Sequence, residues 1–467
     1  MSDYREAAVL IASRNQEELC RAHRADVTAG LLAHAKRLRW SKSRIESERQ
    51  DRLRHLLAYA VEHSPFHADR LAGIDPTSFT EEQLTSLPSM TKEDLMSEFS
   101  SVVTDARLTI GAVEDHVAHV DENDYLFDRF RAVTSSGSSG RRGVFVYDWD
   151  EWTTLSLMLS RPRLGTADNH PRPPGSATAS LFAGEGAHLT KVLRTFLAEP
   201  GDPLHHLPMT LPVADVVRGL NETQPELLMG YPSAIDLVVR EAQAGRLRIS
   251  PRYVETGGEL LMEKTRLAVR ELWGVEIDDS WAVVEGAYAY SCSAGQVMHL
   301  ADDLVIIEPV DLAGQPVAPG EPAAKLYLTN LYNLTQPLIR FEIADGLTLF
   351  DDACSCGSAH RRIANLTGRA DIVFDYAGGV RVHPMVLRIE LHEERHVTEY
   401  QVRQTTRGLS VKVVTERPDE LNEMRDRLVR TLQTAGLRDP EVDIEAVGRL
   451  ERLAAGKLRQ FIPRLGG

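Results

Sequence analysis

The sequence predicts an α/β protein, with a large multi-layered N-terminal domain and a small mobile α+β C-terminal domain. Three observations lead to this prediction. The chain has 467 residues, more than a single hydrophobic core usually serves. Between residues 100 and 345, short strand-like runs alternate with helical stretches, which is typical of α/β layers. The composition shifts near Gly368, so we place the large domain at 1–367 and the small one at 368–467.

Residues 1–100 are expected to be mainly helical. The segment 14–62 is rich in Ala, Leu, Arg and Glu, and its apolar positions recur at helical spacing, which predicts two or three amphipathic helices. Pro65 ends this pattern. Thr91 is a suitable N-cap for the helix that restarts it.

Strands are predicted from short runs of apolar and β-branched residues. In the large domain these runs are 144–147, 226–230, 252–258, 303–310 and 324–330. The proline-rich stretch 161–176 has no periodicity, so we expect a surface loop there. After Gly368 the pattern indicates strand, helix, strand, strand and helix, which completes the small domain.

Composition narrows the function classes. Hydrophobic residues make up 43% and charged residues 26%, the usual balance of a soluble globular protein. The net charge of −15 argues against general binding to nucleic acids or anionic membranes, since both require a positive field. The charged N-terminus lacks the apolar core of a signal peptide, and four cysteines are too few for a disulfide scaffold, so we expect a cytoplasmic protein.

A serine- and glycine-rich loop is the first candidate site. It contains Thr134, Ser135, Ser136, Gly137, Ser138, Ser139 and Gly140, followed by two arginines. Backbone N–H groups and hydroxyls in such a loop can surround a polyphosphate. The loop lacks the Gly-Lys-Ser/Thr ending of the common P-loop, which disfavours a Walker-type NTPase. Taken alone, it fits a flexible serine-rich loop equally well.

The surrounding motifs give this loop a context. After TSSGSSGRRG come MGYPSAIDLVVREAQAGRLRISPRYVETGGELL, DSWAVVEG, QPLIRFEIAD, LTGRADIVFDYAGGVRVHP and AAGKLRQFI. In this order and rough spacing, the chain resembles adenylate-forming enzymes of the phenylacetate–coenzyme A ligase family along nearly its whole length. The resemblance implies the fold of that superfamily and an acid–thiol ligase that uses ATP, Mg²⁺ and coenzyme A.

The resemblance assigns roles to individual residues. Thr134 to Gly140 would hold the β- and γ-phosphates of ATP, Glu285 would bind Mg²⁺, and Asp345 would accept hydrogen bonds from the ribose hydroxyls. Gly257, Gly258 and Glu259 would border the adenine, Trp281 would lie beside the nucleotide, and Arg369 would reach the ribose or phosphate. Neutralising the charges of an in-line phosphoryl transfer requires groups of this kind.

A mobile lysine completes the implied mechanism. Lys457 would bridge the substrate carboxylate and the α-phosphate during adenylation only. The small domain would then rotate about a hinge at Asp371, and Gly378 and Gly379 would line the path of a pantetheine arm. Taken singly, each of these residues also fits a surface turn, a loop or a solvated charge.

Two positions depart from the family pattern. Val284 precedes Glu285 where the family has a hydroxyl residue, which removes a contact to the AMP phosphate. Losing such a hydrogen bond costs about 1.5–3 kcal/mol. Ala344 replaces the usual glycine before Asp345, a change that is tolerable if its φ is negative.

Cysteine and histidine residues form a second constellation. Cys292, His299, Cys354 and Cys356 would complete a tetrahedral Zn²⁺ shell with no open position, which is typical of a structural site. His360 is an alternative fourth ligand. The competing interpretation is that these cysteines are merely small buried apolar residues.

The substrate is predicted only by class. The resemblance implies an aryl or arylacetic acid activated as acyl-AMP and passed to coenzyme A. Alternatives are transfer to an amine or to the phosphopantetheine of a separate carrier protein, and a non-catalytic nucleotide-binding homologue. A homodimer is also compatible with the sequence. Candidates for the pocket wall are Phe182, His188, Met229, Tyr231, Pro232, Trp281 and Ala282.

Overall fold

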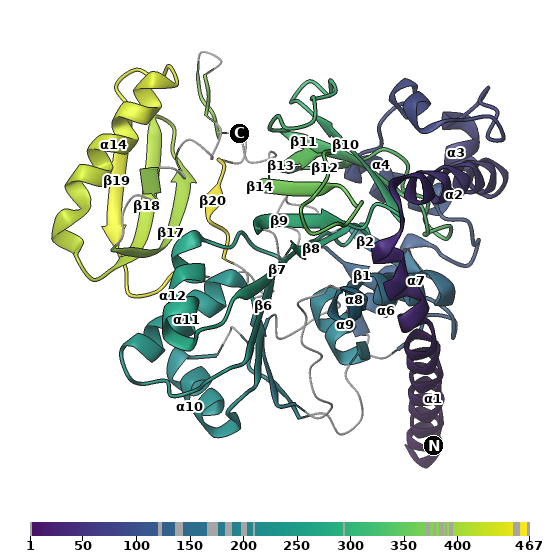
Figure 1. Cartoon of the computed structure of the whole chain (residues 1–467), viewed down its shortest axis with the longest axis horizontal. Coiled ribbons are helices and arrows are strands. Elements are labelled where there is room, and N and C mark those ends of the chain that lie inside the picture. The colour runs from purple at the N-terminus through teal and green to yellow at the C-terminus, as the bar shows by residue number, and fades with distance from the viewer. Residues whose placement is uncertain are drawn as a thin grey trace.

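The computed structural model describes most of the chain and is shown as a ribbon in Figure 1. The described residues are 2–119, 124–135, 143–165, 176–182, 189–197, 203–208, 211–292, 295–369, 374–377, 380–382, 387, 390–391, 396–451 and 458–464.

Helices dominate the N-terminal part, as the sequence predicts. They are α1 (Ser2–Ala35), η1 (Lys36–Arg39), α2 (Lys42–His63), α3 (Pro65–Arg70), η2 (Glu81–Ser86), α4 (Lys92–Ser97), α5 (Phe99–Val102) and α6 (Ile110–His119). Thr91 caps α4 as expected, and Asp94 completes a capping box with it. Helix α1 begins earlier than the periodicity predicts, and Figure 1 shows its N-terminal end extending away from the body of the protein. Among the described helices, none combines the length and apolar composition needed to cross a bilayer.

A nine-stranded mixed sheet forms the centre of the large domain, in the order β13-β14-β9-β8-β7-β6-β5-β3-β4. Its parallel half consists of β3 (Thr178–Leu181), β4 (Leu204–His206), β5 (Leu227–Gly230), β6 (Tyr253–Gly257) and β7 (Ile277–Ala282). Its antiparallel half adds β8 (Tyr288–Cys292), β9 (Gly295–Leu300), β13 (Asp345–Phe350) and β14 (Arg362–Arg369).

Helices cover both faces of this sheet. Three helices pack on the parallel half: α10 (Val213–Thr223), α11 (Pro232–Gln243) and α12 (Glu263–Trp273). Leu228, Val254 and Ile277 of the strands meet Ile235 and Val238 of α11 in one buried cluster. A second buried cluster joins the antiparallel half of the sheet to α1, α7 (Trp149–Ser160) and α9 (Leu189–Leu197). A single helical turn, α8 (Pro162–Gly165), lies in the stretch predicted as a loop.

Two smaller sheets complete the large domain. A hairpin of β1 (Arg131–Thr134) and β2 (Val144–Tyr147) forms a two-stranded sheet of its own. The second sheet contains β10 (Val305–Val310), β11 (Lys325–Asn330) and β12 (Phe341–Ile343), all antiparallel. A backbone bridge between Met90 and Phe341 attaches the N-terminal helical segment to β12.

The small domain has its own sheet and core. Its strands run β19 (Glu441–Ala446), β18 (Gly408–Thr415), β17 (Val397–Gln404) and β20 (Phe461–Ile462) in spatial order. Helix α14 (Leu421–Thr434) packs on this sheet after the short η4 (Pro418–Glu420), and β15 (Phe374–Asp375) pairs with β16 (Arg381–Val382). The residues of its hydrophobic core all lie between 374 and 461. Figure 1 shows this unit beside the large domain.

Two adjacent buried aspartates join the layers of the large domain. Asp303 accepts two hydrogen bonds from Arg161, at 2.6 and 2.7 Å, and forms an ion pair with Arg37 Nε at 2.7 Å. Asp302 is paired with Arg361 and Arg49. Burial alone raises the pKa of Asp303, but the pairs with Arg161 and Arg37 outweigh it and hold that pKa well below its usual range.

Replacing Asp303 with Asn should destabilise the large domain strongly. The change leaves Arg161 and Arg37 without the negative charge that compensates their burial, which typically costs about 3–5 kcal/mol. Chemical unfolding followed by tryptophan fluorescence measures the loss. Glu276→Gln is the control, because its pair with Arg270 is exposed and should leave the unfolding midpoint nearly unchanged. Equal shifts for the two variants would contradict this role of Asp303.

Candidate functional site

The base of the phosphate loop is closed by two hydrogen bonds. Ser135 N donates to Gly143 O at 2.9 Å, and Gly143 N donates to Ser135 Oγ at 2.8 Å. Thr134 is the last residue of β1 and lies opposite Val144 of β2. The hairpin therefore holds the two ends of the loop together, while Ser136 to Gly140 lie outside the described residues.

The turn that carries Glu285 is held by its backbone carbonyls. Tyr147 OH donates to Val284 O at 2.6 Å. Asn330 Nδ2 donates to Glu285 O at 3.0 Å, and Tyr332 OH donates to Gly286 O at 2.9 Å. Burial raises the pKa of both Tyr147 and Tyr332, so both hydroxyls remain protonated donors. Three successive carbonyls are thus fixed, and with them the position of the buried Glu285.

Gly286 is required at this turn for two reasons. Its φ is +99°, a conformation that side-chain-bearing residues rarely adopt. A Cβ atom at this position would lie 2.3 Å from Asn330 Nδ2 and 2.6 Å from Tyr332 OH. The donors can approach the Glu285 turn this closely only because residue 286 has no side chain.

Asn330 is the last residue of β11, and the residues that follow it anchor the hairpin of β1 and β2. Asn333 Nδ2 donates to Val146 O at 2.9 Å, and Gln336 accepts from Val146 N at 3.0 Å. Glu151, at the start of α7, accepts hydrogen bonds from the backbone N–H groups of residues 334 and 335. The amide side chains therefore take the place of a neighbouring strand along β2 and link it to the Glu285 turn. These residues were not predicted from the sequence; the one local signal is that the run NLYNLTQ (330–336) is rich in amide side chains.

The residues predicted around the ribose lie together. Trp281 Nε1 donates to Asp345 Oδ2 at 2.9 Å, across 64 positions of sequence. Asp345 begins β13, and its backbone is paired with that of Arg369 on β14. Ala344 is not among the described residues with positive φ. An alanine can therefore occupy this position, where the family pattern has a glycine.

The predicted adenine turn follows β6. A Cβ on Gly257 would lie 2.7 Å from Ser280 Oγ and 3.2 Å from Ser280 O, so a side chain there would displace Ser280. Gly258 has a φ of +77°, a conformation that favours glycine. Glu259 accepts a hydrogen bond from Ser233 N at 3.1 Å and one from Leu458 N at 3.4 Å.

The candidates for the pocket wall fall into two groups. Phe182 and Tyr231 are buried and meet edge to face, with ring centroids 5.0 Å apart, in the core beneath α10 and α11. Pro232 begins α11, and Met229 lies near the end of β5. Ala282 is the last residue of β7 and follows Trp281. The assignment of these residues to an acyl pocket stays a prediction.

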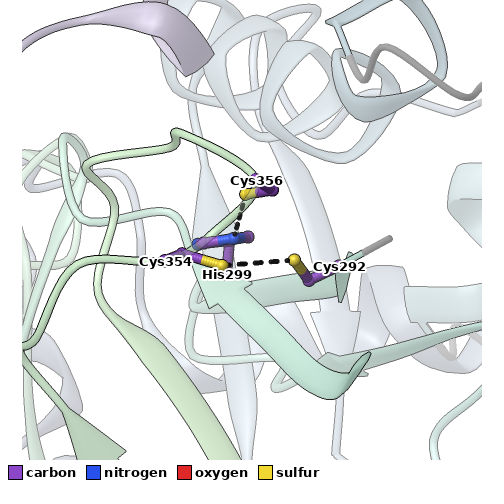
Figure 2. A group of neighbouring side chains, drawn as sticks. All are labelled: Cys292, His299, Cys354 and Cys356. Carbon is purple, nitrogen blue, oxygen red and sulfur yellow. Dashed lines mark hydrogen bonds between the residues drawn. The ribbon is translucent and has the colours of Figure 1, made fainter. Parts of the chain in front are cut away.

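The structure brings together the four Cys and His residues expected to bind zinc (Figure 2). Their ligand atoms, on Cys292, His299, Cys354 and Cys356, all lie within 4.8 Å of one another. Cys292 Sγ is 3.6 Å from Cys354 Sγ, and His299 Nε2 is 3.2 Å from Cys356 Sγ. Zn–S bonds of about 2.3 Å in a tetrahedron place sulfurs about 3.8 Å apart, so the group has the size of a zinc site.

Neighbouring groups orient the histidine of this cluster and lower the pKa of one of its cysteines. His299 Nδ1 lies 2.9 Å from His360 O, which leaves Nε2 directed at the cysteines. Burial lowers the pKa of His299. Burial raises the pKa of Cys354, but hydrogen bonds from Cys356 and Cys292 outweigh it and lower that pKa overall. His360, the alternative ligand, is not in the group; its Nε2 lies 3.2 Å from Arg37 O.

Several predicted residues lie outside the described part of the chain. These are His188, Asp371, Gly378, Gly379 and Lys457, together with Ser136 to Gly140 and the side chain of Arg369. Their roles stay predictions from the sequence.

Comparison with known proteins supports the interpretation of the motifs. No family model matches the chain. Phenylacetate–coenzyme A ligase of Thermus thermophilus is 25% identical, over 90% of this chain and 97% of that protein. The predicted resemblance to this ligase family is thereby confirmed.

Solved structures show the same fold. A 2-hydroxyisobutyryl-CoA ligase in the postadenylation state, in complex with R3-HIB-AMP, matches with a TM-score of 0.69 and 19% identity, over 92% of this chain and 91% of that one. The same ligase in the thioesterification state, with 2-HIB-AMP and CoA, gives 0.58 at the same identity and coverage. The predicted α/β fold, with a large domain and a smaller C-terminal one, is confirmed.

Replacing Gly286 with Ala should displace the Glu285 turn. The new Cβ collides with Asn330 and Tyr332 and also requires a strained φ, so we expect a loss of about 2–4 kcal/mol in unfolding free energy. Thermal and chemical unfolding measure it. Gly274→Ala is a matched control, because Gly274 also has a positive φ, +68°, but open space around it; that variant should lose about 1 kcal/mol. If both variants lost the same amount, the close approach at Gly286 would not matter.

Proposed function

We propose that this protein is an AMP-forming acid–thiol ligase, which activates a carboxylic acid with ATP and transfers the acyl group to coenzyme A. The similarity to a phenylacetate–coenzyme A ligase along 90% of the chain carries this proposal. The hydrogen bond between Trp281 and Asp345 supports it, because it joins two residues that the resemblance assigns to the nucleotide and that lie 64 positions apart in the sequence. The acid is an aryl or arylacetic acid, following the substrate in the relative's name.

The first half-reaction joins two anions. A carboxylate oxygen of the acid attacks the α-phosphorus of ATP, and the bond from that phosphorus to the bridging oxygen of pyrophosphate breaks. The loop from Thr134 to Gly140 holds the departing phosphates, and the Trp281 N–H fixes Asp345 with its carboxylate ready to accept the ribose hydroxyls. Glu285 would hold Mg²⁺, which would supply positive charge against the phosphates. Lys457 neutralises the charge between the two reactants.

The second half-reaction forms the thioester. The thiolate of coenzyme A attacks the acyl carbon, and AMP leaves with the electrons of the carbon–oxygen bond. For this step the small domain rotates about Asp371, so Lys457 withdraws and the pantetheine arm enters past Gly378 and Gly379. Val284 contributes no hydroxyl to the AMP phosphate, and its own carbonyl is engaged by Tyr147.

Zinc has a structural part in this proposal. Three thiolates and one imidazole leave no position for a substrate. The metal would join β8, through Cys292, and β9, through His299, to the segment containing Cys354 and Cys356. That segment leads into β14, and β14 pairs with the strand of Asp345.

The proposed activity is tested by ATP–pyrophosphate exchange with a panel of aryl, arylacetic, fatty and amino acids. We expect exchange with at least one aryl or arylacetic acid, followed by release of AMP and acyl-CoA when coenzyme A is added. If an amine or a phosphopantetheinylated carrier released AMP and coenzyme A did not, the acyl acceptor would be that amine or carrier and not coenzyme A. Exchange with no acid would contradict the function.

Replacing Lys457 with Ala should separate the half-reactions. Pyrophosphate exchange should fall by about 10²–10³, since one charge that stabilises the transition state is lost. Thioester formation from supplied acyl-adenylate should persist. Lys412→Ala is the control, because Lys412 lies in the same domain and its Nζ forms an ion pair with the exposed Glu445 at 3.8 Å. Equal losses in both half-reactions would remove the argument for domain rotation.

The purified protein should contain about one equivalent of zinc, as measured by elemental analysis. Cys354→Ser and Cys356→Ser should each lose most of it, because a tetrahedral site without one thiolate binds weakly. Cys20→Ala is the control: Cys20 is buried in α1 and is not a member of the cluster. Less than half an equivalent in the unaltered protein would contradict the site.

A further inference from the structure

The segment that follows Lys457 is part of the small domain's sheet. Strand β20 pairs in parallel with β17. Val402 N donates to Gln460 O at 2.7 Å, and Gln401 Nε2 donates to Arg459 O at 3.1 Å. Any movement of the small domain therefore carries this segment with it.

The same segment also contacts the large domain. Leu458, the residue next to Lys457, donates its N–H to Glu259 Oε1 at 3.4 Å. The other oxygen of this carboxylate accepts the N–H of Ser233 at 3.1 Å. That N–H belongs to the first turn of α11, where a helix cannot satisfy its own backbone donors. Glu259 thus bridges the start of α11 and the segment of the predicted lysine.

A lysine makes a second contact between the domains. Lys264, near the start of α12, donates from Nζ to Val397 O at 3.0 Å. Val397 is the first residue of β17, the strand to which β20 is bound. Burial lowers the pKa of Lys264 and Arg240 lowers it further, while the carboxylates of Asp236, in the large domain, and Glu399, in the small domain, oppose this shift. A charged donor makes a stronger hydrogen bond than a neutral one.

We infer that Glu259 and Lys264 form a two-point latch that holds the small domain in the arrangement used for adenylation. Both contacts act on the β17–β20 pair, one at the lysine segment and one at the beginning of β17. The latch must open before the thiol can enter, because rotation of the small domain separates β17 and β20 from α11 and α12. Lys264 is a positioning residue in this scheme: it acts on Lys457 through β17 and touches no substrate. The inference rests on the proposed two-step function.

Lys264→Met tests the latch through the two half-reactions. The substitution keeps an unbranched side chain and removes the charged donor. Pyrophosphate exchange should fall about fivefold, while thioester formation from supplied acyl-adenylate should stay the same or rise. Lys264→Arg, which retains a cationic donor, should keep most of the pyrophosphate exchange activity of the unaltered protein. Lys412→Met is the matched control, because its partner Glu445 lies in the same small-domain sheet, and both half-reactions should be unchanged.

Hydrogen–deuterium exchange gives a readout that needs no substrate. Peptides covering 458–464 should exchange several-fold faster in Lys264→Met and in Glu259→Ala than in the unaltered protein, because their contact with the large domain is lost. Peptides of α14 should be unaffected, which shows that the small domain remains folded.

The outcomes separate the latch from the proposed function. The latch would be overturned if Lys264→Met lost both half-reactions equally. It would also be overturned if deuterium uptake by peptides covering 458–464 were unchanged in the variants. Absence of pyrophosphate exchange in the unaltered protein, together with faster deuterium uptake in the variants, would overturn the proposed function and leave the interdomain contact standing.

Discussion

The buried charge of Asp302 and Asp303 is the constraint on which the large domain depends. These carboxylates follow β9, and their arginine partners come from η1, α2, the end of α7 and the residue before β14. Hydrophobic packing alone is non-directional, whereas a buried carboxylate must be met by donors in a defined geometry. The pair therefore fixes how the N-terminal helices sit on the central sheet. His360, whose carbonyl orients His299, lies immediately before Arg361, so the cluster of Cys and His residues belongs to the same framework.

The candidate site is built largely on backbone groups. Side chains from β2 and from residues 330–336 donate to the carbonyls of the Glu285 turn and satisfy the free edge of β2. A buried carbonyl costs free energy unless a donor meets it, so these amides and hydroxyls stabilise the fold and define the site with the same contacts. At Val284 the turn is held through the backbone carbonyl, so its position does not depend on a hydroxyl group in that side chain.

Much of the fold was predictable because helices and strands leave a local period in the sequence. The strands at 144–147 and 324–330 and the cap at Thr91 are confirmed. Trp281 and Asp345, which the resemblance assigns to the nucleotide, are joined by a hydrogen bond, while their roles stay predictions. The roles of Tyr147 and Gln336 could not be predicted, because each depends on a partner more than a hundred positions away. The packing of Phe182 against Tyr231 in the core could not be predicted from the sequence either, because an aromatic residue after a strand can face either a core or a ligand.

The two-stranded hairpin of β1 and β2 has a consequence for how the protein acquires its structure. The side chains that anchor it, Asn333 and Gln336, lie 187 and 190 positions further along the chain than Val146. Contacts of such long range form slowly, because a large loop must close before they are made. On the ribosome, β1 and β2 emerge early but have no anchor until synthesis has passed residue 336. The hairpin at the base of the predicted phosphate loop is therefore among the last parts of the large domain to assemble, and we expect nascent chains shorter than this to lack the proposed nucleotide binding.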